Sequence, residues 1–130
     1  MAYDVATLEK KYKVTVPARM KKLVKELAKY KGAKLKRPID GKLTEYSTVV
    51  LGSAQLFDTN LFDKRLHPGF IPIAALADDR GSWRLELFAL ACGDTASGAV
   101  FFGRAMQAGG LAKVTPTLDA FLAKLALPPA

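Results

Sequence analysis

The sequence predicts a single α+β domain in which helices pack on a mostly antiparallel sheet. Two helix-like segments come first, a series of strand-like segments separated by short turns follows, and a further helix closes the chain. At 130 residues, with half of them hydrophobic and a quarter charged, the chain has the size and composition of one globular unit with one core. We therefore expect residues 1–130 to form one domain.

The first two predicted helices each carry an apolar side. Residues 4–11 form the first, and the second begins at Pro17, because proline is favoured at the first helical position, and ends at Gly32. In the second helix, apolar residues recur at the spacing of one stripe, which predicts contact with the core, while lysines on another side are expected to face solvent. The stripe consists of Met20, Leu23, Val24 and Leu27, and the lysines are Lys21, Lys22, Lys25 and Lys29.

The next segment, residues 32–43, is expected to be a basic connector, because glycines and a proline interrupt it. Residues 45–52 are rich in β-branched and aromatic residues and predict a strand. The apolar residues of 53–66 indicate a short helix or helical turns. The connector therefore separates the helical part of the chain from the predicted sheet.

Three further strands and a helix complete the predicted fold. The strands cover residues 70–76, 83–90 and 99–106 and are joined by turns rich in Asp and Gly. Pro72 predicts that the first of them is an edge or irregular strand, because proline has no N–H to donate to the ladder. The last helix begins at Pro116. Its apolar stripe consists of Leu118, Phe121, Leu122 and Leu125.

The positive charge of the chain is concentrated near its N-terminus. The net charge is +8, and residues 1–42 hold 13 of the 20 lysines and arginines but only 4 of the 12 acidic residues. Such asymmetry is typical of a protein with an acidic partner, a nucleic acid or a membrane surface to bind, and equally of a solvated helix face.

Several features predict a cytoplasmic protein without a membrane partner. No apolar run approaches the length of a membrane span, and the N-terminal stretch MAYDVATLEKKYK lacks the apolar core of a secretory signal. The single cysteine, Cys92, cannot form an internal disulfide, so nothing indicates an oxidising compartment.

The sequence does not predict an enzyme, a cofactor or a metal site. A hydrolytic triad needs a histidine base, and the chain has only His67, with no nucleophile motif around any serine or around Cys92. One cysteine and one histidine are too few for a typical zinc site, and the glycine-rich stretches lack the lysine and spacing of a phosphate-binding loop. We expect His67 to be a loop residue and Cys92 to be a small buried or turn residue.

The acidic residues between the predicted strands are best explained as turn residues. Asp78 and Asp79 precede Gly81, and aspartates in turns bond their own backbone, whereas adjacent residues at a strand end point in opposite directions and need not converge on a metal. Trp83 follows this turn. It either packs on the sheet or stands partly exposed as an anchor for a partner, a role in which tryptophan is enriched.

A nucleic-acid-binding module that uses the basic residues 10–42 is an alternative. Tyr12 and Tyr30 lie in this segment, where aromatic residues would stack on bases. However, the segment contains no helix-turn-helix, zinc-finger or aromatic RNA-binding motif.

Residues 67–102 resemble the central signature of the SUKH superfamily. The resemblance lies in the strand PGFIPIA at residues 68–74, an acidic turn with Gly81, the strand WRLEL at 83–87, and the strand GAVFF at 98–102. The flanking stretches VPARMKKL and LDAFLAKL are similar to the early and closing helices of the family. Two departures are the single glycine after the early helix and Ser82, which stands where the family has an acid.

The resemblance implies a curved antiparallel sheet with helices packed on it and no catalytic residues. It also implies that Ile71, Ile73, Leu85 and Leu87 lie in the sheet core and that Gly81 serves a turn. Many bacterial members are immunity proteins that neutralise a cognate toxin, often a nuclease of a polymorphic toxin system, by covering its active site. A yeast member regulates cell-wall synthesis, so a general protein-interaction hub is a second alternative.

The charge of the chain qualifies what the resemblance implies about the partner. An inhibitor of a nuclease is expected to be acidic, whereas this chain is basic. Either the acidic turns supply a local negative face, or the toxin surface is itself acidic, and the second interpretation is slightly favoured. A monomer and a weak dimer both remain open. The candidate partner contacts are Lys34, Lys36, Arg37, Asp78, Asp79, Trp83, Glu86 and Asp94.

Overall fold

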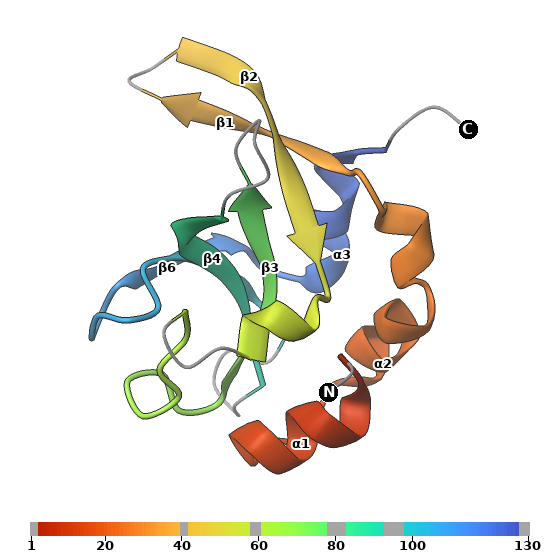
Figure 1. Ribbon diagram of the computed structural model, residues 1–130, viewed down its shortest axis with the longest axis vertical. Helices are drawn as coiled ribbons and strands as arrows, with labels where there is room; N and C mark the ends of the chain where they lie inside the picture. The colour runs from red at the N-terminus through yellow and green to blue at the C-terminus, as the bar shows by residue number, and fades with distance from the viewer. Residues whose placement is uncertain (1–2, 40–41, 58–60, 78–82, 93–97, 128–130) are drawn as a thin grey trace.

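The computed structural model describes residues 3–39, 42–57, 61–77, 83–92 and 98–127, of which 36–39, 42–47 and 83–85 are described by their backbone alone. These residues form one antiparallel sheet with three short α-helices and two 3₁₀ turns (Figure 1). The expected α+β fold with a curved sheet is confirmed.

The sheet has seven strands in the order β6-β5-β4-β3-β2-β1-β7, and its paired neighbours run antiparallel. Figure 1 shows that it curls around the helix α3. Consecutive strands lie beside one another from β1 to β6, and the short last strand returns to the β1 edge. The strands are β1 (Lys34–Ile39), β2 (Lys42–Leu51), β3 (Phe70–Ala77), β4 (Trp83–Ala91), β5 (Val100–Gly103), β6 (Leu111–Thr115) and β7 (Leu125–Ala126).

The three predicted helices form, but the second is broken and the last is shorter than expected, so that Leu125 of its predicted stripe lies in β7. Helix α1 (Val5–Tyr12) is capped by the Asp4 carboxylate, and α3 (Leu118–Ala123) is capped by the Thr117 hydroxyl. The second predicted helix ends early, as α2 (Ala18–Lys25), and continues as the 3₁₀ helix η1 (Leu27–Tyr30). The α-helical hydrogen bonding ends here because the Glu26 N–H donates to the Leu23 carbonyl, three residues back rather than four, which is the pattern of a 3₁₀ helix. The remaining 3₁₀ turn is η2 (Ala54–Phe57).

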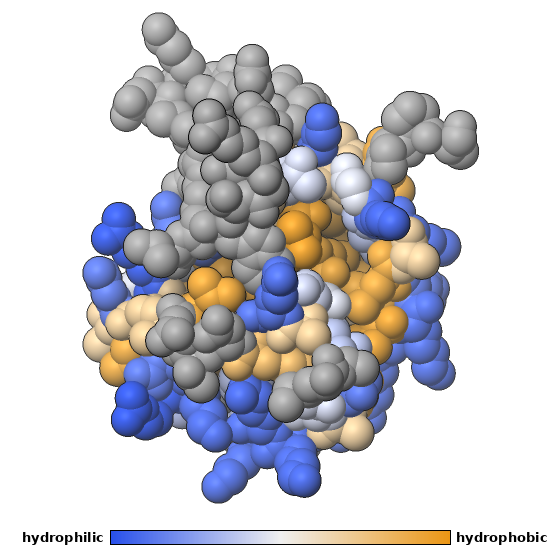
Figure 2. All heavy atoms as spheres, viewed as in Figure 1, coloured by the Kyte–Doolittle hydropathy of each residue, from blue (hydrophilic) through white to orange (hydrophobic). Residues whose placement is uncertain are grey.

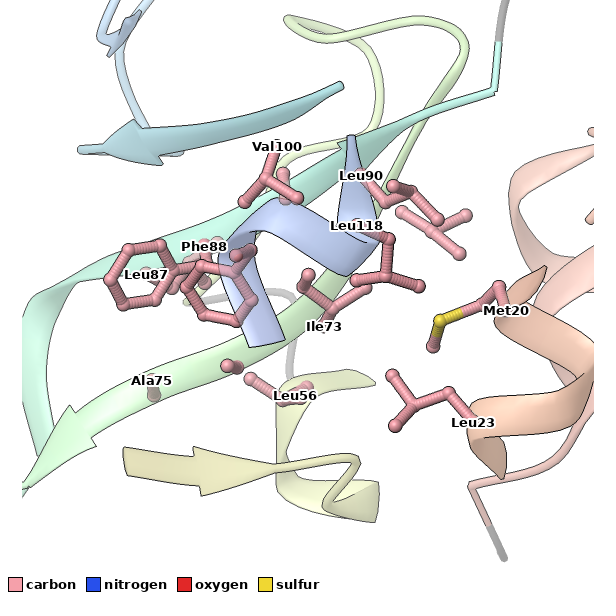
Figure 3. Packing of buried hydrophobic residues seen from close by; sticks show 14 of the residues in the cluster. Met20, Leu23, Leu56, Ile73, Ala75, Leu87, Phe88, Leu90, Val100 and Leu118 are labelled. Atoms are coloured by element: carbon pink, nitrogen blue, oxygen red, sulfur yellow. The ribbon is translucent and has the colours of Figure 1, made fainter. Parts of the chain in front are cut away.

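The core lies between the sheet and the helices α2 and α3. Figure 3 shows the side chains of Met20 and Leu118 pointing toward Ile73 and Leu90, so both helices bury their apolar stripes against the sheet. The ring of Phe121 lies 4.8 Å from that of Phe88. Each side chain buried in this way contributes about 1.5–3 kcal/mol. The predicted core positions Ile71, Ile73 and Leu87 are buried, whereas the side chain of Leu85 lies outside the description.

A row of ring contacts joins α1 to the sheet. It begins with Tyr3 stacked on Phe57, whose ring centroids are 5.4 Å apart, and ends with Phe70 against Phe101, at 4.9 Å. His67 belongs to this row and lies in a loop before β3, as expected, but its side chain is only 6 % exposed. The rings in between are Tyr12, Phe62 and His67.

The expectation of a basic connector over residues 32–43 is wrong. This segment forms β1 and the start of β2, which pair in a hairpin with Lys34 opposite Thr48. The proline lies at a shift of register next to the hairpin turn rather than in a linker, and bulges are where sheets tolerate proline.

The prediction for Pro72 is half right. The strand β3 is central, so the edge assignment is wrong, but its register shifts between Pro72 and Ala74, so it is irregular. The pairing of β3 with β2 ends at Ala74. Pro72 lies beyond this point, so its missing N–H leaves no carbonyl of β2 without a donor. The Pro72 carbonyl instead accepts a hydrogen bond from the Tyr3 hydroxyl at 2.8 Å. The strands β6 and β7 were not expected from the sequence.

Candidate partner-binding surface

Helix α2 separates its lysines from its apolar residues. Met20 and Leu23 are fully buried against the sheet, whereas Lys21, Lys22 and Lys25 are exposed, as the spacing predicts. Lys21 and Lys25 are one helical turn apart and therefore lie above one another on the outer side. The helix thus holds its cations away from the core.

The row of lysines continues beyond α2. Lys29 in η1, Lys31 after it and Lys34 at the start of β1 are all exposed. Over residues 21–34 the only acidic residue is Glu26, whose carboxylate lies 3.8 Å from the Lys29 ammonium. Such an exposed pair offsets little of the positive field. We call these six lysines the basic face: Lys21, Lys22, Lys25, Lys29, Lys31 and Lys34. Figure 2 shows hydrophilic side chains along this margin of the molecule, over α2 and η1.

The basic face rests on a framework that joins the two ends of the chain. The guanidinium of Arg19 in α2 pairs with the carboxylate of Asp119 in α3 and lies close enough to Tyr30 of η1 to interact with it electrostatically. These contacts, with Asp119 the largest, raise the pKa of Arg19 above its ordinary value. The helices α2 and α3 and the turn η1 are therefore tied together beneath the lysines.

An open groove lies between η1 and the end of β2. We call it the η1–β2 groove; its volume is about 380 Å³. It exists because β1 begins at Lys34, opposite Thr48, so the last residues of β2 have η1 and the following turn beside them in place of a strand. In Figure 2 the surface between β2 and η1 is apolar. The groove is lined by Leu27, Ala28, Tyr30, Lys31, Gly32, Thr48, Val49, Val50 and Leu51.

A glycine lets η1 approach β2 closely at one end of this groove. Gly52 has φ +63°, and a Cβ atom at this position would lie 2.5 Å from a methyl carbon of Leu27. Leu27 therefore lies directly over the backbone that follows β2. The side chains of Leu27, Val50 and Leu51 are only half-buried, so the groove keeps apolar surface open to solvent.

Lysines flank the groove. Lys31 lines it, and Lys34 is paired with Thr48, which also lines it. No acidic residue is among the lining residues. The sequence analysis assigned Leu27 to the core and the end of β2 to an ordinary strand. The alternation of lysines with Tyr30 and Gly32 was the available signal, but the groove itself depends on the register of β1 on β2.

A second groove, of about 400 Å³, lies between the end of α1 and residues 62–65. Its charges are largely engaged within the groove. Arg65 pairs with Asp63 at 3.1 Å, and the Lys64 ammonium donates to the Lys11 carbonyl at 3.1 Å. It therefore offers less free charge to a partner than the basic face does.

The structure places the candidate contact residues apart rather than in one cluster. Lys34 is exposed, and Lys36 and Arg37 follow it in β1, with side chains outside the description. Trp83 begins β4, where its backbone pairs with Ala77. Because β2 and β3 lie between β1 and β4, the two groups are about 14 Å apart across the sheet.

Among the described residues, the acidic candidates do not form a negatively charged surface. Asp78, Asp79 and Asp94 lie outside the described residues, as does Gly81. Glu86 lies in β4 and is half-buried. Of the candidates whose side chains are described, Lys34 alone belongs to the basic face.

Cys92 and His67 are the two residues that the sequence offers for acyl transfer. Burial raises the pKa of the Cys92 thiol to about 12, so the thiol is protonated at neutral pH and is a weak nucleophile. His67 is enclosed by the rings of Phe62 and Phe70, and its Nε2 atom has no hydrogen-bond partner. Both are packed as core residues.

Metal and membrane features were sought in the described part of the chain. Within it, no group of three or more His, Cys, Asp or Glu side chains is arranged to hold a metal ion. The described helices are all too short and too polar to cross a membrane. The sheet, the basic face and the groove find no counterpart by comparison: no family model, curated protein or solved structure matches the chain.

Proposed function

We propose that the protein is a non-enzymatic binding protein whose basic face docks on an acidic surface of another protein. Following the resemblance to the SUKH superfamily, the partner is a cognate toxin, which the protein neutralises inside the cell that makes it. The observation that carries the proposal is the basic face itself. Six exposed lysines accompany one acidic residue over residues 21–34, from α2 through η1 to the start of β1.

The mechanism is occlusion of the toxin. Opposite charge on the two surfaces accelerates their encounter and sets their orientation, and the docked domain then covers the active site or substrate groove of the toxin. Because four of the lysines lie on α2 and η1, whose backbone is already ordered, little backbone order has to be gained on binding, which favours affinity.

The burial of the aromatic residues supports a protein partner over a nucleic acid. Stacking on bases needs exposed rings, but Tyr12 is only 8 % exposed within the row of ring contacts. Tyr30 is half-buried in the groove wall and lies beside Arg19. The tyrosines that motivated the nucleic-acid alternative are therefore not free platforms for bases.

The proposal is tested by co-expressing the protein with toxins encoded by neighbouring genes and measuring cell survival and complex formation. We expect rescue and a one-to-one complex with one such toxin. The triple variant Lys21→Glu, Lys25→Glu and Lys29→Glu should lose both. The matched control reverses the exposed residues Lys10, Lys113 and Lys124, which lie outside the basic face, and should keep both.

Two outcomes would contradict the proposal. If the toxins still kill in the presence of the wild-type protein, the toxin-neutralising function is wrong. If the protein is retained on DNA or RNA at low salt, and retention falls steeply with salt and is lost in the triple variant alone, the basic face binds nucleic acid instead.

A further inference from the structure

We infer that the η1–β2 groove is the anchor pocket of the basic face, and that it receives one apolar side chain of the partner from a segment with carboxylates on both sides. The inference rests on the proposed function and adds to it the chemistry of the bound segment. Three observations carry it: the open apolar lining, the flanking lysines, and the position of the groove beside the basic face.

The lining of the groove is suited to an apolar side chain. Leu27, Val50 and Leu51 keep part of their surface open to water, although neighbouring Val49 is buried. The volume of about 380 Å³ is at the lower end of the range for ligand sites, and it accommodates a leucine or a phenylalanine side chain. Burial of one such side chain strengthens binding by about tenfold or more.

The lysines around the groove favour acidic residues on both sides of the partner's apolar residue. Lys31 lines the groove, and Lys34 lies beside its wall at Thr48. The next cation along η1 is Lys29. An apolar centre within a charged rim is the usual anatomy of a protein-binding hot spot, and a cationic rim is complementary to aspartate and glutamate. A basic or uncharged segment with the same apolar residue is therefore disfavoured.

The groove is also preformed. Leu27 lies over Gly52, which fixes one end of η1, and Tyr30 at the other end is half-buried beside Arg19. Beneath η1, the Val49 N–H donates to the Ala33 carbonyl at 2.8 Å, which joins the following turn to β2. A partner side chain therefore enters an existing cavity rather than opening one.

The test uses synthetic peptides with glutamates on both sides of a single central residue, which is serine, valine, leucine or phenylalanine. All the peptides have the same charge, so their affinity differences report the groove alone. We expect the leucine and phenylalanine peptides to bind about tenfold more tightly than the serine peptide by fluorescence anisotropy. The amide resonances of Val50 and Leu51 should shift only with the apolar peptides.

The matched variants are Ala28→Trp and Ala6→Trp. Both alanines are exposed, but only Ala28 lines the groove. The indole at residue 28 should fill the groove and remove the preference for apolar peptides, and the variant at residue 6 should keep it. Circular dichroism establishes that both variants are folded, and Ala28→Leu replaces the larger substitution if folding is lost.

The results separate the two proposals. Equal affinity of the wild-type protein for all the peptides, or an unchanged preference in Ala28→Trp, would overturn the inference and leave the basic face as a binding surface. Failure of every acidic peptide to bind would overturn the inference and would also contradict the basic face as a site for acidic partners. A third experiment uses a single-stranded oligonucleotide and the serine peptide as competitors of the bound leucine peptide. If the oligonucleotide is the more effective competitor, the inference is overturned and the groove is assigned to nucleic acid.

Discussion

Replacement of Phe121 by alanine should destabilise the whole domain. The side chain is fully buried in α3, and its ring lies 4.8 Å from that of Phe88 in the sheet. Loss of such a ring and the cavity that it leaves cost about 3–5 kcal/mol. Since a domain of this kind is stable by only about 5–15 kcal/mol, the change removes a large part of the unfolding free energy. We expect the melting temperature to fall by roughly 10–20 °C.

The assay is urea unfolding followed by circular dichroism, with two controls. Phe121→Leu keeps most of the volume and loses the ring pair, so it should cost about 1–1.5 kcal/mol. Lys124→Ala lies at the exposed end of the same helix and should change stability by less than about 0.5 kcal/mol. A cost of less than about 1 kcal/mol for Phe121→Ala would refute the packing of α3 on the sheet.

Two further predictions concern single residues. The Cys92 thiol, with its pKa raised from 9.0 to about 12 by burial, should react with aromatic disulfide reagents at pH 8 far more slowly in the folded protein than in denaturant. Because this thiol ionises at lower pH when the protein is unfolded, the unfolding free energy should fall as the pH rises from about 9 to about 12. The fall due to this group is at most about 1.4 kcal/mol per pH unit, and Cys92→Ala should reduce that slope. Gly103→Ala should cost about 3 kcal/mol or more, because its Cβ would lie 1.9 Å from a carbonyl oxygen across the β5–β6 hairpin. Gly98→Ala, where φ is also positive but nothing lies within 4 Å, should cost only about 1–2 kcal/mol in urea unfolding; equal costs would contradict the close approach.

Elements with a strong local period were predictable from the sequence. The buried Met20 and Leu23 and the exposed lysines of α2 follow directly from helical spacing. The strands β3 and β4 follow from runs of apolar residues without helix signals, and the proline predicts the start of α3 to within two residues. In each case the information lies within a few residues of the chain.

Elements that depend on distant neighbours were not predictable. The residues of β1 alternate poorly, and they form a strand because β2 pairs with them after the hairpin turn. His67 lies in the expected loop, but nothing local in the sequence indicates that Phe62 and Phe70 enclose its ring. The lysines of the basic face were visible in the sequence, but the groove beside them results from where β1 begins relative to Thr48.

The outer edge of β1 has a bearing on how the protein avoids self-association. Strand β7 pairs with β1 only at Lys34 and Leu35, and no other described strand continues along that edge. An unpaired strand edge is a template for amyloid-like stacking, and natural sheets protect such edges with cations and proline. Lys36, Arg37 and Pro38 occupy this stretch. We therefore expect that neutralisation of Lys36 and Arg37 would favour aggregation even where no partner is present.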